Sequence, residues 1–533
     1  MMASIGNVNA AGGARAFEHE RAWRTAFWVV LTVVLALRLV LAASLAPFGD
    51  EAWYWQESRA LDGSYSDLPV ATALLIRLGE SLFGHGVLAM RAPFLLLGAL
   101  LPWILVGTAR RLFGAAAGWC TGTLALLLPL IGTLGIFALP DVPLTLCSAL
   151  ALDAMERAAR TRRTRDWLTL GLALAGAWLS HYRAAMLLAA GFAFLCLTRR
   201  GRGLWREPGL WLALGVSCLG LLPLLVFNAT HDWAALRFQL VERNPWSFHA
   251  DALVQPLEQA LVCTPLFYLL LLWAAWRCLR RAREGAPWEL FALCGIVPIA
   301  AFFVLGCFAD DTRFRVHWPL PGYLPLLLAL PPLVAAGGRG VRRAFAAALA
   351  VLVLGAAGTF AYLGTAATPD GAALLTRFKA FPEHFVGWQD AAARTRELLA
   401  EPRFADAVLV ADNFMLAAEL DFALGGTRPV YSLDHPINAK HGRAPQLALW
   451  QRDEAALRAL GAVPVLLVAE PTARRERERL PWMQTLCTRL DHLVAVAALD
   501  PYGGRKRYRW YAGVVPTADR SARSPDDCPA AAY

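Results

Sequence analysis

Long apolar segments separated by short polar ones fill the first two thirds of the chain. A helix that crosses the hydrocarbon core of a bilayer needs about 20 apolar residues, and most of these segments approach that length, so we expect about eleven spans. The count depends most on three short segments between residues 141 and 198. The expected spans are 26–46, 86–109, 115–137, 141–158, 166–181, 182–198, 207–227, 255–276, 288–308, 316–336 and 342–364.

Arginine residues gather in the polar loops on one side of this arrangement. These loops contain Arg21 and Arg24, Arg110 and Arg111, and residues 157–165, 199–206, 277–283 and 339–343. Short loops rich in Lys and Arg stay in the cytoplasm, so this side is predicted to be cytoplasmic. The opposite side receives loop 47–85, the turn at Asp141, loops 229–254 and 309–315, and everything after residue 364.

The pattern changes near residue 365 to that of a soluble domain. Short apolar runs at 407–411 and 463–469 predict buried strands, and residues 413–424 between them have helical periodicity. Strand, helix and strand in this order favour an α/β domain. We therefore divide the chain into a cytoplasmic segment (1–25), a transmembrane domain (26–364) with a long outer loop (47–85), and a soluble extracytoplasmic α/β domain (365–533).

The composition supports a polytopic membrane protein, because 57% of the 533 residues are hydrophobic and 20 are Trp. We interpret the net charge of +10 as a topology signal, not as affinity for nucleic acid. Cys487 and Cys528 lie in the polar C-terminal region and could pair if that region is outside the cytoplasm, which the sequence leaves open. The other cysteines lie in or beside apolar segments without metal-ligand spacing and are interpreted as small buried residues.

An acidic pair, Asp50-Glu51, follows the first apolar segment directly. Unpaired charge is costly near the bilayer, so such residues are candidates for function. The alternative is that the pair only stabilises the N-terminus of the helix that follows. A second acidic turn, Tyr65-Ser66-Asp67-Leu68-Pro69, lies in the same loop and favours a functional role.

These motifs resemble those of bacterial lipid-linked-sugar glycosyltransferases of the GT-C type, relatives of dolichyl-phosphate-mannose protein mannosyltransferases and of the lipid A aminoarabinose transferase. The stretch Phe48 to Gln56 is similar to the opening of the first outer loop in that family. The further similar segments are 65–69, 139–144, 228–233 with Phe238, Gln239 and Arg243, and 315–319, with weaker likeness at Gly387-Trp388 and 443–450. Leu68 departs from the pattern, because relatives often carry His or Lys after the acid of the turn.

The resemblance implies a mostly α membrane protein with a multi-span helical bundle. It also implies transfer of a sugar from a polyprenyl phosphate to a hydroxyl on an envelope acceptor, which is lipid A or lipopolysaccharide, another glycan, or a protein. Asp50 is the candidate general base, in a displacement that would invert the anomeric centre. Glu51 is the second catalytic candidate, and it would orient Asp50 or hold a cation of the loop.

The leaving phosphate needs positive charge and hydrogen-bond donors. The candidate substrate-binding residues are Asp67, Asp141, His181, Arg183, Arg243, Arg315 and His317. The alternative roles are an ordinary turn for Asp67, a helix start for Asp141, and snorkelling to the interface for the arginines.

The reaction implies no required metal, although Asp50, Glu51 and Asp67 could bind a divalent cation through their oxygens. We expect a multi-pass protein of the bacterial inner membrane, with its C-terminal domain in the periplasm. A polytopic lipid or sugar transporter or flippase without transfer activity is the main alternative, and a scaffold for an envelope partner is another. Asp50 distinguishes them, because only the transferase needs its carboxylate.

Overall fold

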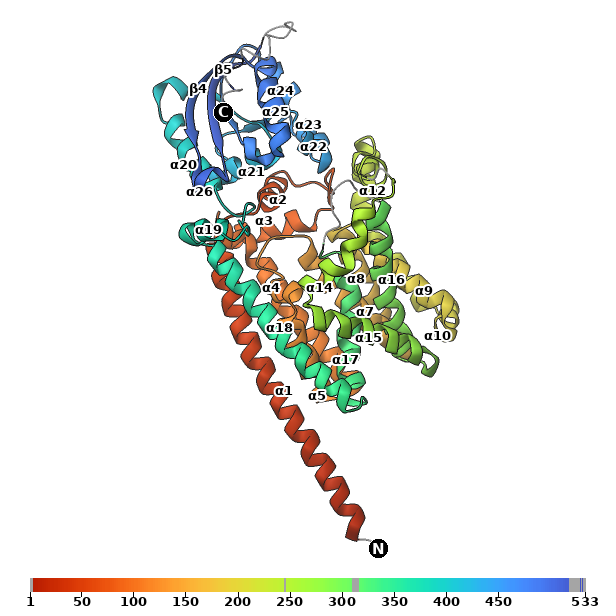
Figure 1. Cartoon of the computed structure of the whole chain (residues 1–533). Helices are drawn as coiled ribbons and strands as arrows, with labels where there is room; N and C mark the ends of the chain where they lie inside the picture. Colours follow the sequence, from red (N-terminus) through yellow and green to blue (C-terminus); the bar gives the residue numbers. More distant parts are fainter. Residues whose placement is uncertain (1–2, 244–245, 309–315, 517–527, 529, 531–533) are drawn as a thin grey trace.

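The computed structural model describes residues 3–243, 246–308, 316–516, 528 and 530. Figure 1 shows a helical bundle, with α1 extending along one side of it, and a smaller domain with a sheet stacked on one end. The helices of the bundle and its loops are α1 (Ala3–Ser44), α2 (Gly49–Arg59), α3 (Ala71–Phe83), α4 (Val87–Phe113), α5 (Ala115–Leu127), α6 (Pro129–Gly132), α7 (Asp141–Thr161), α8 (Thr164–Ser180), α9 (Ala184–Leu197), α10 (Arg199–Arg202), α11 (Pro208–Leu219), α12 (Leu222–Thr230), α13 (Ala234–Arg237), α14 (Gln255–Val262), α15 (Pro265–Arg281), α16 (Trp288–Phe308), α17 (Leu320–Ala335) and α18 (Arg339–Ala366).

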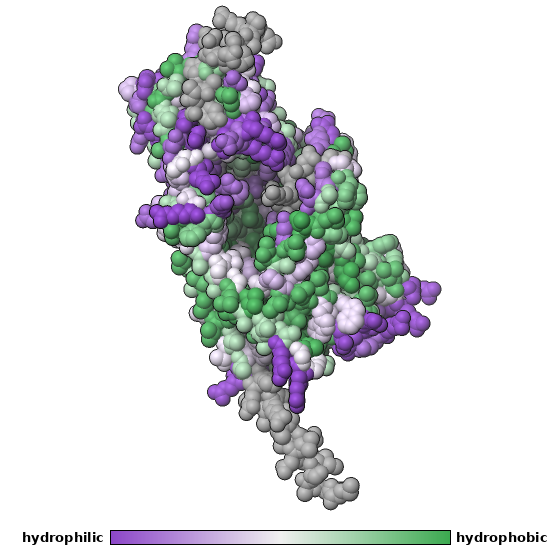
Figure 2. Space-filling model, viewed as in Figure 1, coloured by the Kyte–Doolittle hydropathy of each residue, from purple (hydrophilic) through white to green (hydrophobic). Residues whose placement is uncertain are grey.

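The surface of the bundle is apolar. Figure 2 shows a broad hydrophobic region over the bundle, with hydrophilic residues at its lower edge and over the stacked domain. Such a large exposed apolar surface fits lipid contact, because soluble proteins rarely expose patches larger than a few hundred Å².

Fewer unbroken spans are present than the apolar pattern predicts. Among the described residues, four helices are long and apolar enough to cross a membrane: Glu20–Ser44, Val87–Phe113, Trp288–Phe308 and Arg339–Ala366. The number rises to seven at most if each of three bent helix pairs is one span. The expected count of about eleven is therefore not confirmed.

The bent pairs explain much of the difference. The expected spans near 182–198, 207–227 and 255–276 correspond to helix pairs that bend by 92°, 42° and 108°. In the third pair α14 ends at Val262, and Pro265 takes the first position of α15, where its missing N–H costs nothing. Hydropathy shows that such a segment is apolar but does not show where its helix turns.

The C-terminal part contains a five-stranded sheet in the order β2-β1-β3-β5-β4. Its strands are β1 (Val408–Ala411), β2 (Val430–Ser432), β3 (Pro464–Ala469), β4 (Asp491–Leu499) and β5 (Tyr508–Val514). Its helices are α19 (Pro369–Thr376), α20 (Trp388–Leu399), α21 (Phe414–Ala423), α22 (Pro436–Lys440), α23 (Ala444–Leu449), α24 (Glu454–Ala459), α25 (Glu476–Arg489) and α26 (Pro501–Gly504). The two apolar runs are the parallel strands β1 and β3, so the predicted strand, helix and strand are confirmed.

A buried arginine on α4 connects three parts of the bundle. The Arg91 guanidinium donates hydrogen bonds to the carbonyl oxygens of Ala42 (2.9 Å), Leu45 (2.9 Å) and Ala46 (3.0 Å) at the end of α1. It also forms a fully buried ion pair with Glu51 in the first turn of α2. Arg91 therefore binds carbonyl groups in the last turn of α1 and just after it, and it fixes the position where α2 begins.

Cys487 on α25 and Cys528 form a disulfide, which answers the question that the sequence left open. The bond closes a loop with a sequence separation of 41, for which loop entropy predicts about 4 kcal/mol of stabilisation.

We expect the double variant Cys487→Ser/Cys528→Ser to lower the unfolding free energy of the C-terminal domain by about that amount, as measured by denaturant unfolding of the full chain. Cys218→Ser, which removes an exposed free thiol, is the matched control. Equal stability of the double variant and the control would contradict the prediction.

Candidate active site

The two neighbouring acids of α2 face different partners. The Glu51 carboxylate accepts hydrogen bonds from Arg91, from the backbone N–H of Phe48 (2.9 Å) and from that of Ala138 (2.6 Å). It has no exposed side-chain surface. The geometry gives Glu51 a capping and cation-holding position, whereas the Asp50 side chain remains 28% exposed.

An arginine from the C-terminal domain reaches the carboxylates of the first outer loop. Arg443 lies at the N-terminus of α23, and its Nη2 is 3.1 Å from Oδ1 of Asp50. The same guanidinium pairs with the Asp67 carboxylate and lies 3.9 Å from Oε1 of Glu57. Asp50, Glu57 and Asp67 of the loop thus surround the Arg443 guanidinium. Arg443 is 393 residues from Asp50 in the sequence.

Burial changes the pKa of Glu57. Burial raises the pKa of Glu57 to about 8, while the charge of Arg443 and a hydrogen bond from Trp53 Nε1 (2.9 Å) act in the opposite direction. Its Oε2 atom is buried and has no hydrogen-bond partner among the residues that the structure describes. Glu57 is therefore mostly protonated at neutral pH, which leaves Asp50 and Asp67 to share the charge of Arg443.

A second group of charged residues lies where α7, α9 and α17 begin. Arg183 Nη2 is 2.7 Å from Oδ1 of Asp141, and His317 Nε2 is 3.5 Å from the same oxygen. The guanidinium groups of Arg183 and Arg243 lie 5.9 and 5.3 Å from the ring centroid of Trp318. The sequence thus pointed to residues that the fold brings together from four distant segments.

Gln239 connects the two groups. Its Nε2 donates to the backbone carbonyl of Asp67 (2.8 Å), and its Oε1 accepts from Nη1 of Arg243 (3.2 Å). The contacts run from Asp50 through Arg443 and Asp67 to Gln239 and Arg243. We call this connected set the acid–arginine site.

The remaining candidates are placed as follows. His181 is buried beside Arg183, and its Nδ1 accepts the Arg183 backbone N–H (3.1 Å). Arg315 lies outside the described residues. Asp50, Glu51 and Asp67 each face an arginine, and no group of three or more His, Cys, Asp or Glu in the described part of the chain could hold a metal ion.

Sequence reasoning missed Arg443 and Glu57 as parts of the site. Two signals were present for Arg443. Leu68 leaves the acidic turn without the cation that relatives often carry, and the stretch beginning at Arg443 has a weak likeness to the family. For Glu57 the sequence offers no signal, since its perturbation arises from burial under the C-terminal domain.

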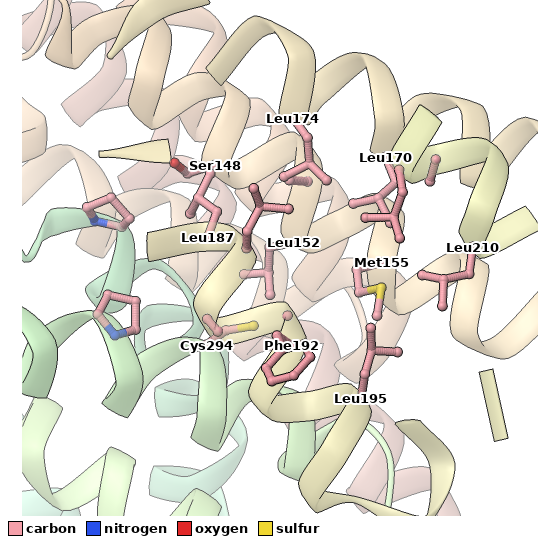
Figure 3. Close-up of a pocket in the computed structure, with 18 of the residues that line it drawn as sticks. Ser148, Leu152, Met155, Leu170, Leu174, Leu187, Phe192, Leu195, Leu210 and Cys294 are labelled. Carbon is pink, nitrogen blue, oxygen red and sulfur yellow. The ribbon is translucent and has the colours of Figure 1, made fainter. Parts of the chain in front are cut away.

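An apolar cavity of about 220 Å³ lies in the bundle. It is lined in part by α7 and α9, two of the helices that begin at the second charged group. Figure 3 shows Ser148, Leu152 and Met155 of α7 facing it, together with Leu187 of α9. Leu187 lies about one helical turn after Arg183, and Ser148 lies about 10 Å along α7 from Asp141. The cavity therefore begins about one helical turn from the second charged group along α9.

Comparisons with known proteins address the fold and the family of this chain. Residues 67–227 match the family described as dolichyl-phosphate-mannose-protein mannosyltransferase. The lipid A galacturonosyltransferase RgtD of Rhizobium johnstonii is 26% identical over 390 residues, covering 71% of this chain and 77% of that protein. The crystal structure of ArnT from Cupriavidus metallidurans bound to undecaprenyl phosphate has a TM-score of 0.64 at 16% identity, covering 93% of this chain and 99% of that one.

The family model, the relative RgtD and the ArnT fold together support the GT-C superfamily of glycosyltransferases for this chain. The oligosaccharyltransferase of Archaeoglobus fulgidus shares the fold more distantly, with a TM-score of 0.51 at 11% identity over 88% of this chain and 72% of that one. The expected superfamily, the enzyme class and the helical fold with a C-terminal sheet domain are confirmed. This GT-C glycosyltransferase is a multi-pass membrane protein, and nothing in the comparisons favours a transporter.

The titration of Glu57 gives a first test of the site. Because its folded-state pKa of about 8 lies above the ordinary 4.5, the folded enzyme binds more protons than the unfolded chain between these values. Stability from this group is therefore fully present below about pH 4.5 and is lost as the pH rises towards 8. We expect the melting temperature of Glu57→Gln to fall less over this window than that of the wild type, as measured by thermal unfolding in detergent. Asp62→Asn, an exposed acid of the same loop, is the control, and equal slopes for wild type and Glu57→Gln would refute the assignment.

Proposed function

We propose that this GT-C glycosyltransferase moves a sugar from a polyprenyl-phosphate donor to a hydroxyl group of an envelope glycolipid of the lipid A type. The observation that carries the proposal is the acid–arginine site, in which a partly exposed carboxylate and a cationic group are connected by direct contacts. The relatives support the substrates, since RgtD is named for lipid A and ArnT was solved with undecaprenyl phosphate. Other envelope glycans and proteins present the same acceptor chemistry.

Asp50 is the general base in this proposal. Its carboxylate takes the proton of the acceptor hydroxyl while that oxygen forms a bond to the anomeric carbon of the sugar. The bond from the anomeric carbon to the phosphate oxygen breaks, and the polyprenyl phosphate leaves with the electron pair. Attack opposite the leaving group inverts the anomeric centre.

The cationic group receives the leaving phosphate. Arg183, Arg243 and His317 offer N–H donors at one place, and a planar guanidinium can bind two phosphate oxygens. The Asp141 carboxylate holds Arg183 and His317 in place through its Oδ1 atom. The apolar cavity of Figure 3 takes the first isoprene units of the donor, because it begins about one helical turn from Arg183.

The remaining acids position the site. Glu51 contributes to catalysis by fixing the first turn of α2 through Arg91, which places the neighbouring Asp50. Asp67 connects Arg443 to Gln239, and through it to Arg243.

We place the site and the C-terminal domain on the periplasmic face of the inner membrane. Two observations support this orientation. The arginine-rich loops lie on the other side of the predicted topology. The disulfide of Cys487 and Cys528 suits an oxidising compartment, since such bonds are rare in the cytosol.

The first test removes the base. We expect Asp50→Asn to reduce kcat for sugar transfer by about 10²- to 10⁴-fold, because the amide cannot accept the proton. Purified wild type and variant would receive a set of radiolabelled polyprenyl-phosphate sugars with envelope lipid extract, and label would be followed into the acceptor. Asp62→Asn is the matched control in the same loop. Equal transfer by wild type and Asp50→Asn would remove Asp50 as the base.

The second test addresses the phosphate. Arg243→Gln should raise the KM for the donor by about 10- to 100-fold, which corresponds to the loss of one charge-assisted hydrogen bond. The matched control is Arg237→Gln, which removes an exposed arginine of the same loop that pairs with Glu242. Steady-state kinetics with varied donor measures both variants. A KM equal to that of the control would place the phosphate elsewhere.

A further inference from the structure

Arg443 is the residue through which the C-terminal domain enters the acid–arginine site. Its side chain is 4% exposed, although it belongs to a domain that is otherwise built around its own sheet. An arginine buried this deeply between two parts of a protein needs compensating charge. Asp50 and Asp67 supply that charge from the membrane part.

Aromatic rings fix the orientation of the guanidinium. Its carbon atom Cζ lies 5.0 Å from the ring centroid of Trp53, 5.2 Å from that of Tyr54 and 5.4 Å from that of Phe414. The first two rings belong to α2 and the third to α21. Cations are attracted to ring faces at these distances, so Arg443 is held from both sides of the domain boundary.

The backbone around Arg443 is attached to the acidic turn. The Ser66 hydroxyl donates to the carbonyl oxygen of Gly442 (2.5 Å), and the Ser66 backbone N–H donates to Oε1 of Gln446 (2.9 Å). Gly442 has a φ of +73°, and a Cβ there would lie 2.5 Å from the ring of Phe238. Only glycine fits this close approach, which brings segment 442–446 against the turn and against the loop that carries Gln239.

The contact with Asp50 is selective. Arg443 holds Oδ1 of Asp50, while the Asp50 side chain keeps 28% of its surface exposed. The buried neighbour Glu57 lies 3.9 Å from the same guanidinium and is mostly neutral, so it does not compete strongly for the charge. One oxygen of Asp50 is thereby fixed in direction and the rest of the carboxylate faces outward.

We propose that Arg443 is a positioning residue for the transfer reaction, supplied by the C-terminal domain, which orients the Asp50 carboxylate towards the acceptor hydroxyl. The proposal rests on the function proposed above. It assigns the C-terminal domain a direct part in the chemistry, beyond covering the site. It also explains how this chain compensates for Leu68, since the acidic turn receives its cation from Arg443 instead of from the loop itself.

The test compares variants of the full-length enzyme in detergent or nanodiscs. Arg443→Gln should lower kcat by about 100-fold, because misplacing a reacting group by about 1 Å costs that much. The KM for the donor should change less than threefold, since Arg443 contacts the base and not the phosphate. Arg443→Lys keeps the charge but lacks the planar fork, so its kcat should lie between those of wild type and Arg443→Gln.

Chemical rescue separates positioning from a purely structural role. Guanidinium ions added at millimolar concentration should restore part of the kcat of Arg443→Ala by binding between Asp50 and Asp67. The matched control is Arg452→Gln, which removes an arginine of the same domain that pairs with Asp421 (3.6 Å) away from Asp50. This control should retain wild-type kcat and show no response to guanidinium.

Several outcomes would overturn the inference. If Arg443→Gln raises the KM for the donor and leaves kcat unchanged, Arg443 is a phosphate ligand. If Arg443→Gln raises kcat, the contact of Arg443 with Asp50 inhibits the reaction. A purely structural role for Arg443 would give three results together. Arg443→Gln would fail to fold, Arg443→Lys would keep the wild-type kcat, and guanidinium would not rescue Arg443→Ala. Failure of the wild type with every donor would instead overturn the proposed function, so the two failures are distinguishable.

Discussion

The buried ion pair between Arg91 and Glu51 is the interaction on which the arrangement of the site depends. Neither side chain has exposed surface, so each charge requires the other and removal of one partner would leave an uncompensated buried charge. Arg91 also binds carbonyl groups in the last turn of α1 and just after it. Together these contacts set the start of α2 across the end of the bundle. Asp50, which directly precedes Glu51 in the first turn of α2, is positioned as a consequence.

The acid–arginine site is composite. Its carboxylates come from loop 47–85, Gln239 and Arg243 come from the segment after α13, and its central arginine comes from the C-terminal domain. Desolvation decides how the charge is distributed: Glu57 is neutralised by burial, while Asp50 and Asp67 stay paired with Arg443. The short spacing along α9 between Arg183 and the apolar cavity supports the amphiphilic donor proposed above.

Several elements could be predicted from local patterns. The runs 407–411 and 463–469 are strands because short apolar stretches between turn residues suit a buried parallel sheet. Asp50, Asp67, Asp141 and Arg183 could be selected because acids and arginines at the ends of apolar segments lie at a membrane surface. The number of spans could not, because hydropathy does not show where an apolar helix bends.

The sequence by itself determined the membrane class, the superfamily and the helical fold with a C-terminal sheet domain. These follow from hydropathy, charge distribution and motif order, which are local properties of the chain. Only the tertiary structure decided that Glu51 faces Arg91, that Glu57 is neutral and that Arg443 reaches Asp50. The reason is that ion pairing and burial depend on which distant segments come together in the low-dielectric interior. Arg443 and Asp50 are 393 residues apart, so no local pattern in the sequence indicates their contact.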